Sequence, residues 1–173
     1  LKNKKRERYP KQPEENILYF IEKNSPKLKN WQRELIRIVR KTAQYFYPQG
    51  QTKVINEGCA TFSHFEIINK MYEDGYLNDG FMMEFFHNHS NVIFQPSFDS
   101  NYYSGINPYT LGFNIFMDIK RMALNPTEED KEWFPEIAGK KDWASTFRHI
   151  VENFKDETFI LQYLSPKVIR DMK

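Results

Sequence analysis

The stretch NEGCATFSHFE, residues 56–66, brings a carboxylate, a thiol and an imidazole together in one short segment. We expect it to lie on a helix from about Lys53 to Glu73, because Asp74-Gly75 is a helix C-terminal signal. A second cluster, His87-Asn88-His89, follows downstream. Three of the four histidines of the chain lie in these two clusters, so they are the first place to look for a site.

The region before this stretch predicts another helix. Apolar residues recur at helical spacing from Leu28 to Phe46, and Pro48-Gln49-Gly50-Gln51 predicts a turn after them. We expect a basic face on another side of this helix, either exposed to solvent or bound to a protein partner. It consists of Arg33, Arg37, Arg40 and Lys41. Residues 1–12 are rich in lysine and arginine and are expected to be a solvated basic arm or linker.

Helix start signals also recur after the stretch. Asn107-Pro108 predicts a cap with proline in the first turn, and Asn125-Pro126-Thr127-Glu128 predicts a capping box with Glu at N3. Asp142 and Ser165-Pro166 predict two further starts. We therefore predict a mostly α-helical fold. It is a single helical domain over residues 13–173, with at most a short strand or extended segment near 91–95.

Composition limits the partners. The net charge is only +2, which gives no electrostatic basis for binding nucleic acid or an anionic membrane. No apolar run approaches the roughly 18 residues that span a bilayer. The single cysteine, Cys59, excludes an internal disulfide and fits a reducing compartment.

Spacing limits what Glu57 and His64 can do together. Seven residues are almost two helical turns, so both side chains point the same way, but the helical rise separates them by about 10 Å. They cannot easily bind one metal ion directly, and Glu57 also suits an ordinary first-turn carboxylate. Glu66 points to a different face and is expected to be solvated. Cys59 has no base fixed near it, so a packed small hydrophobe is the favoured interpretation over a nucleophile.

The role of His87 and His89 depends on the backbone. On a helix they face nearly opposite sides, whereas on a strand they share a face and can meet one ion. Both alternatives remain open from the sequence, and the β-leaning residues 91–94 favour the extended one.

Several motifs resemble the stage V sporulation protein R (SpoVR-like) family. The central signature is Asn56-Glu57-Gly58 with Ala60-Thr61-Phe62 and His64. The resemblance covers roughly residues 10–171. Its other motifs are Trp31-Gln32-Arg33-Glu34, residues 102–109 (YYSGINPY), residues 125–130 (NPTEED) and Trp133-Phe134-Pro135.

The resemblance implies a cytoplasmic bacterial protein associated with spore cortex formation, with relatives in bacteria that form no spores. It also implies a longer chain with a further histidine-rich motif upstream. Asn56-Glu57-Gly58 is similar to the segment of gluzincin metallopeptidases whose glutamate binds zinc. The similarity implies that Glu57 is a zinc ligand, with other ligands in residues outside this chain. The clustering of the histidines adds His64, His87 and His89 as further ligands or proton carriers. Cys59 and Ser63 stand where the family usually has tryptophan, which changes the aromatic walls near this stretch.

Two functional hypotheses follow. One is a zincin-like, metal-dependent hydrolase acting on a peptide or a cell-wall-related amide. The alternative is a non-enzymatic regulatory or scaffold protein of sporulation or the stress response, which binds a protein partner through the basic face.

Overall fold

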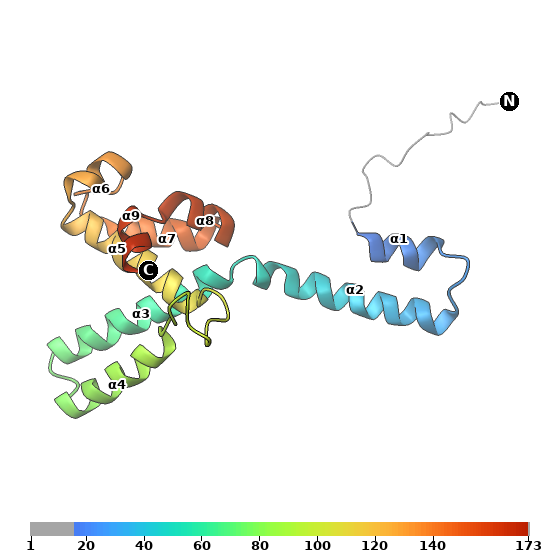
Figure 1. The fold of residues 1–173 in the computed structure, drawn as a ribbon, viewed down its shortest axis with the longest axis horizontal. Coiled ribbons are helices and arrows are strands. Elements are labelled where there is room, and N and C mark those ends of the chain that lie inside the picture. The colour runs from blue at the N-terminus through green and yellow to red at the C-terminus, as the bar shows by residue number, and fades with distance from the viewer. Residues whose placement is uncertain (1–15, 173) are drawn as a thin grey trace. The chain divides into compact units, whose positions relative to one another are not determined.

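The computed structural model describes residues 16–172, and the chain divides between Gly50 and Gln51 into two compact units. All regular structure in the described residues is helical, so the predicted mostly α-helical fold is confirmed (Figure 1). In the segment near 91–95, where a short strand or extended chain was expected, residues 91–92 are helical and residues 94–95 have no regular structure. The predicted basic arm, residues 1–12, lies outside the described residues.

The first unit is a pair of helices, α1 (Ile17–Asn24) and α2 (Asn30–Gly50). The side chain of Asn16 caps α1 by accepting hydrogen bonds from two backbone amides of its first turn. The helix α2 extends through Pro48 to Gly50, so the turn predicted at Pro48 was placed too early. Pro48 has no N–H to donate to the carbonyl four residues earlier, so α2 continues past it with one backbone hydrogen bond fewer.

The second unit begins with a helical hairpin, α3 (Lys53–Glu73) and α4 (Asp79–Val92). Gly75 has φ +79° and follows the end of α3, as the sequence predicts. The amides of Gly75 and Tyr76 donate to the carbonyls of Tyr72 and Met71, the pattern of a Schellman cap. The Asn78 side chain then accepts a hydrogen bond from the Phe81 amide and starts α4. The sharp connection allows α3 and α4 to lie side by side (Figure 1).

The helix α5 (Pro108–Leu124) forms the centre of the second unit. Ile115, Phe116, Ile119 and Met122 are each almost completely buried, as their spacing predicts. Four shorter helices follow in chain order: α6 (Glu128–Trp133), α7 (Trp143–Asn153), α8 (Asp156–Tyr163) and α9 (Pro166–Asp171). Their starts at Asp142 and Ser165 are confirmed.

One predicted cap differs in detail. Thr127 is the N-cap of α6, but the capping-box partner at N3 is Asp130 and not a glutamate. The side chain of Asp130 accepts hydrogen bonds from the Thr127 amide and hydroxyl, both at 2.7 Å.

The close crossing of α3 and α5 depends on two glycines. A Cβ atom built on Gly58 would lie 2.5 Å from the Gly112 Cα, and one built on Gly112 would lie 2.4 Å from the Val54 carbonyl oxygen. Only residues without a Cβ permit such an approach. Gly58 of the central signature is therefore a packing residue that sets the distance between α3 and α5.

The N-terminus of α3 is held by a residue about 100 positions away. The Asp156 carboxylate, at the start of α8, accepts hydrogen bonds from the amides of Val54 and Ile55, both at 2.9 Å. The Asp156 amide in turn donates to the Gln51 carbonyl at 2.8 Å. These bonds satisfy free helix N–H groups and place a negative charge at the positive end of the α3 dipole.

Candidate functional site

A hollow of about 380 Å³ lies between α3, α4 and the start of α5. Its polar lining consists of Thr61 and His64 from α3, Asn88 and His89 from α4, and Tyr109 from α5. Ala60, Phe85 and Val92 supply apolar lining. The predicted site stretch and the second histidine cluster thus meet at one place.

His89 is the most constrained of these side chains. It is only 8% exposed, and its ring centroid lies 5.2 Å from Phe65, 5.4 Å from Phe85 and 4.9 Å from Phe113. Burial lowers the pKa of His89, and the nearby His64 lowers it further. The imidazole is therefore kept neutral near pH 7. Its Nε2 atom is buried without a hydrogen-bond partner.

An unpartnered buried nitrogen is costly, since it has given up water and gained nothing in exchange, a penalty of about 1–3 kcal/mol. Each such group in a folded protein calls for an explanation, and a ligand that supplies the missing hydrogen bond is one. The position of His89 on the wall of a hollow fits that explanation.

His64 lies beside the same hollow but is exposed to solvent. Its ring meets Phe85 edge to face, with 5.2 Å between centroids. Its charge affects the pKa of His89, so the two imidazoles are close enough to interact. The hollow therefore has a buried, neutral imidazole, that of His89, and a solvent-exposed imidazole, that of His64, on its walls.

Glu57 reaches the site through Tyr109. The Tyr109 hydroxyl donates a hydrogen bond to the Glu57 carboxylate, and this bond, followed by burial, raises the pKa of Tyr109. Tyr109 therefore keeps its proton near pH 7. Glu57 does not line the hollow itself, in agreement with the spacing argument that separates it from His64.

Asn107 holds Tyr109 in position. Its side-chain oxygen accepts the Tyr109 amide hydrogen bond at 3.0 Å and caps α5. Its side-chain amide donates to the carbonyls of Val92 and Phe94 at 2.9 and 3.1 Å. Thr110 adds a hydrogen bond from its hydroxyl to the Ile93 carbonyl at 2.7 Å. One asparagine therefore ties the end of α4 to the start of α5.

His87 lies outside the hollow. Residues 87–89 belong to α4, so the helical alternative applies and the extended one is wrong. His87 is exposed, and its Nε2 lies 3.5 Å from the Asn91 side-chain nitrogen. Because i and i+2 positions on a helix face nearly opposite ways, His87 and His89 cannot share an ion.

The four predicted zinc ligands do not converge on one point in the described residues. Across residues 16–172, no group of three or more His, Cys, Asp or Glu side chains is arranged to hold a metal ion. His64 and His89 are neighbours, but Glu57 is engaged with Tyr109 and His87 is elsewhere. A catalytic zinc ion needs three protein ligands, so the described residues do not fit one by themselves.

Two other residues of the stretch have structural contacts. Cys59 is half-buried against the core, and burial raises the pKa of its thiol, which agrees with a packed hydrophobe. Glu66 was expected to be solvated, but it forms an ion pair with Lys120 of α5. Neither belongs to the hollow.

Sequence reasoning missed Tyr109 and Asn88. Tyr109 is adjacent to Asn107-Pro108, which correctly predicted the start of a helix, but helix capping carries no information about what the next side chain touches. Asn88 lies between the two histidines, where it was treated as a spacer.

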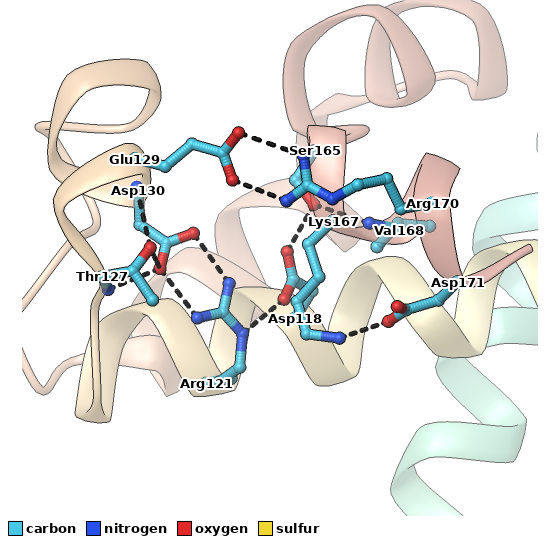
Figure 2. A network of polar contacts seen from close by, with 10 residues as sticks. All are labelled: Asp118, Arg121, Thr127, Glu129, Asp130, Ser165, Lys167, Val168, Arg170 and Asp171. Carbon is cyan, nitrogen blue, oxygen red and sulfur yellow. Dashed lines mark hydrogen bonds and ion pairs between the residues drawn. The ribbon is translucent and has the colours of Figure 1, made fainter.

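A second polar cluster lies at the far end of α5 and stabilises the fold (Figure 2). The Arg121 guanidinium makes two hydrogen bonds of 2.7 Å to Asp130 and one of 2.6 Å to Asp118. The Ser165 hydroxyl donates to Asp118 at 2.6 Å and caps α9. The Arg121 side chain thus joins α5 to α6 and, through Asp118, to the start of α9.

No described helix is both long enough and apolar enough to cross a membrane. No solved structure matches the chain significantly. The chain is 60% identical over 166 residues to the uncharacterized protein YcgB of Escherichia coli (strain K12). That match covers 96% of this chain but 32% of YcgB, so the chain spans about a third of the length of this relative. The pattern of the family described as SpoVR like protein matches residues 1–173. The signature at Asn56-Glu57-Gly58 and the matches over the whole chain agree: this chain belongs to the SpoVR-like family.

Proposed function

We propose that the hollow between α3, α4 and α5 is part of the active site of a hydrolase that acts on a peptide or a cell-wall-related amide. The observation that carries the proposal is the neutral, buried His89, whose Nε2 has no partner and which lies beside a second imidazole. A neutral imidazole next to a cavity is suited to act as a general acid–base group. Hydrolysis of an amide requires such proton transfer, from the attacking water and to the leaving amine.

The charges around the hollow suit this role. His89 is uncharged and can accept a proton from a bound water molecule as its oxygen attacks the amide carbonyl, and it can then return the proton to the leaving amine. His64 is exposed and can exchange protons with solvent. Tyr109 stays protonated because of Glu57, so it contributes a neutral phenol to the wall of the site.

The zinc-dependent form of this proposal needs ligands from elsewhere. The described residues supply too few donors at one point, whereas a SpoVR-like relative is about three times as long as the region matched here. A bound zinc ion would supply an activated water molecule at neutral pH. In that form, Glu57, His64 and His89 would be this chain's contribution to the ligand set.

Family membership suggests a setting in sporulation or the stress response, with amides of the cell wall as the substrate class. The alternative, a scaffold that binds its partner through the basic face of α2, has less support. Arg33 donates hydrogen bonds to the Glu22 and Ser25 carbonyls, and Arg40 pairs with the buried Glu22 carboxylate. Two of the four basic residues therefore hold α1 against α2.

The test uses the full-length SpoVR-like polypeptide that carries this sequence. Purified protein is incubated with peptides and cell-wall fragments, cleavage is followed by mass spectrometry, and bound zinc is measured in parallel. We expect His89→Gln to lower cleavage at least about 100-fold, the usual effect of removing an acid–base group, with secondary structure intact.

His87→Gln is the matched control, because His87 lies on the same helix two residues away but outside the hollow. It should retain cleavage. The absence of cleavage in wild-type protein, or an equal loss in both variants, would contradict the proposal. About one zinc per chain that is lost in Glu57→Ala would support the metal-dependent form, and zinc that is unaffected by this change would exclude Glu57 as a ligand.

A further inference from the structure

Within the described part of the first unit, residues 16–50, the helix α2 carries an apolar stripe that α1 does not cover. None of its residues is fully buried, although its sequence is strongly amphipathic. Five large side chains on one face are each more than half exposed, and we call them the α2 stripe. They are Trp31, Leu35, Ile38, Val39 and Phe46.

The helix α1 does not cover this stripe, because it occupies another side of α2. Contact with α1 is made by Arg33, whose guanidinium donates to the Glu22 and Ser25 carbonyls, and by Arg40, which pairs with Glu22 and lies 5.0 Å from the Tyr19 ring. At about 100° per residue, Arg33 and Arg40 each lie more than about 90° around the helix from the centre of the α2 stripe. The apolar face is therefore separate from the interface within the first unit.

An exposed apolar stripe of this kind is unusual on the surface of a complete folded protein. Folded monomers rarely leave several large apolar side chains exposed along one helix face, and larger patches mark interfaces. The stripe extends over sixteen residues from Trp31 to Phe46, or about 22 Å of helix, enough for four turns of a facing helix.

The length of the relative YcgB indicates what kind of segment covers the α2 stripe. YcgB matches this chain over nearly its whole length, yet about two thirds of YcgB lies outside the match. A segment of the same polypeptide is present at high effective concentration and needs no separate association step.

We propose that the α2 stripe is the docking surface for an amphipathic helix from the part of the SpoVR-like polypeptide outside residues 1–173. Its apolar face would cover Leu35, Ile38 and Val39 between the two aromatic ends. Acidic side chains on its flank would suit Lys41, which is exposed on α2. In the complete protein the stripe is then an internal interface.

The test places the photoreactive amino acid p-benzoylphenylalanine at position 35 of the full-length polypeptide. After irradiation, the products are separated by mass and digested, and the crosslinked peptides are identified. The matched control has the same amino acid at Arg37, two residues away and on another face. We expect position 35 to give a crosslink within one chain, to a peptide outside residues 1–173, with at least a several-fold higher yield than position 37.

Three outcomes would overturn the proposal: a crosslinked dimer, which would indicate a second copy; a crosslink to residues 51–172; or equal yields at both positions. Cysteine accessibility provides an independent measurement. The thiol of Leu35→Cys in the full-length protein should react with iodoacetamide at least ten times more slowly than that of Arg37→Cys. Equal rates would show an uncovered stripe and reject the interface.

Discussion

The substitution Gly58→Ala tests whether the crossing of α3 and α5 determines the geometry of the second unit. The new Cβ would lie 2.5 Å from the Gly112 Cα and 2.6 Å from the Gly112 carbonyl carbon. Carbon atoms in good contact lie about 3.5–4.0 Å apart, so the two helices would have to separate by about 1 Å. Both partners are backbone atoms, and no side-chain rotation can relieve the clash.

The magnitude follows from two opposing effects. Overpacking a core costs about 1–3 kcal/mol, and a clash against backbone belongs at the upper end of that range. Alanine in place of glycine within a helix returns up to about 1 kcal/mol. We therefore expect a net loss of about 2 kcal/mol, which corresponds to a decrease in Tm of about 4–8 °C for a chain of this size.

The assay is thermal unfolding followed by circular dichroism, with urea unfolding as a second measure of the free energy. Gly80→Ala is the matched control. Gly80 is also helical, but the nearest atom to its added Cβ would be the Asn78 side-chain oxygen at an ordinary 3.4 Å. This control should be unchanged or slightly more stable. If Gly58→Ala were as stable as Gly80→Ala, the reasoning from the close crossing would be refuted.

Three further predictions concern polar groups. Asp156→Ala should lower the free energy of unfolding by about 1–2 kcal/mol in urea, because the first turn of α3 loses its acceptor; an unchanged midpoint would contradict this. The Arg121 guanidinium holds the pKa of Asp130 well below its usual range, so the pair stabilises the fold above about pH 4 and less as the pH falls below that value. Asp130→Asn should therefore cost about 2–3 kcal/mol at pH 7, with a difference from wild type that shrinks in acid, and a constant difference would argue against it. The lowered pKa of His89 means that its contribution is complete above about pH 6.5 and is lost below it. Urea unfolding of wild type should then show a loss of up to about 1 kcal/mol between pH 7.5 and 5.5, which disappears in His89→Gln and persists in His87→Gln.

The helix starts were predictable because capping is local. Asn107, Asp142 and Ser165 each accept a hydrogen bond from an amide two or three residues away, so the signal lies within a few positions of the helix it starts. The misplaced turn at Pro48 and the wrong N3 residue beside Thr127 show the limit of this approach. A local signal indicates that an element begins or ends nearby, and contacts in the folded chain decide the residue.

The basic face of α2 shows a different limit. Periodicity correctly separated the apolar and basic residues of this helix into two faces. It could not tell which face meets a neighbour, and the structure brings Arg33 and Arg40 against α1 while the apolar stripe is exposed. Amphipathicity shows that two faces of a helix differ in polarity. It does not show which element packs against either face.

The candidate site shows both limits together. The sequence alone identified the family, the helical class and the two histidine-containing segments, and helical spacing already separated Glu57 from His64. Only the tertiary structure decided that His64 and His89 share a hollow, that His87 does not, and that Tyr109 connects Glu57 to it. The physical reason is that these contacts depend on the approach of α3 and α5 at Gly58 and on α4 being helical through His89. Side chains distant in sequence meet only after the helices have packed, whereas helix formation and capping are settled within a few residues.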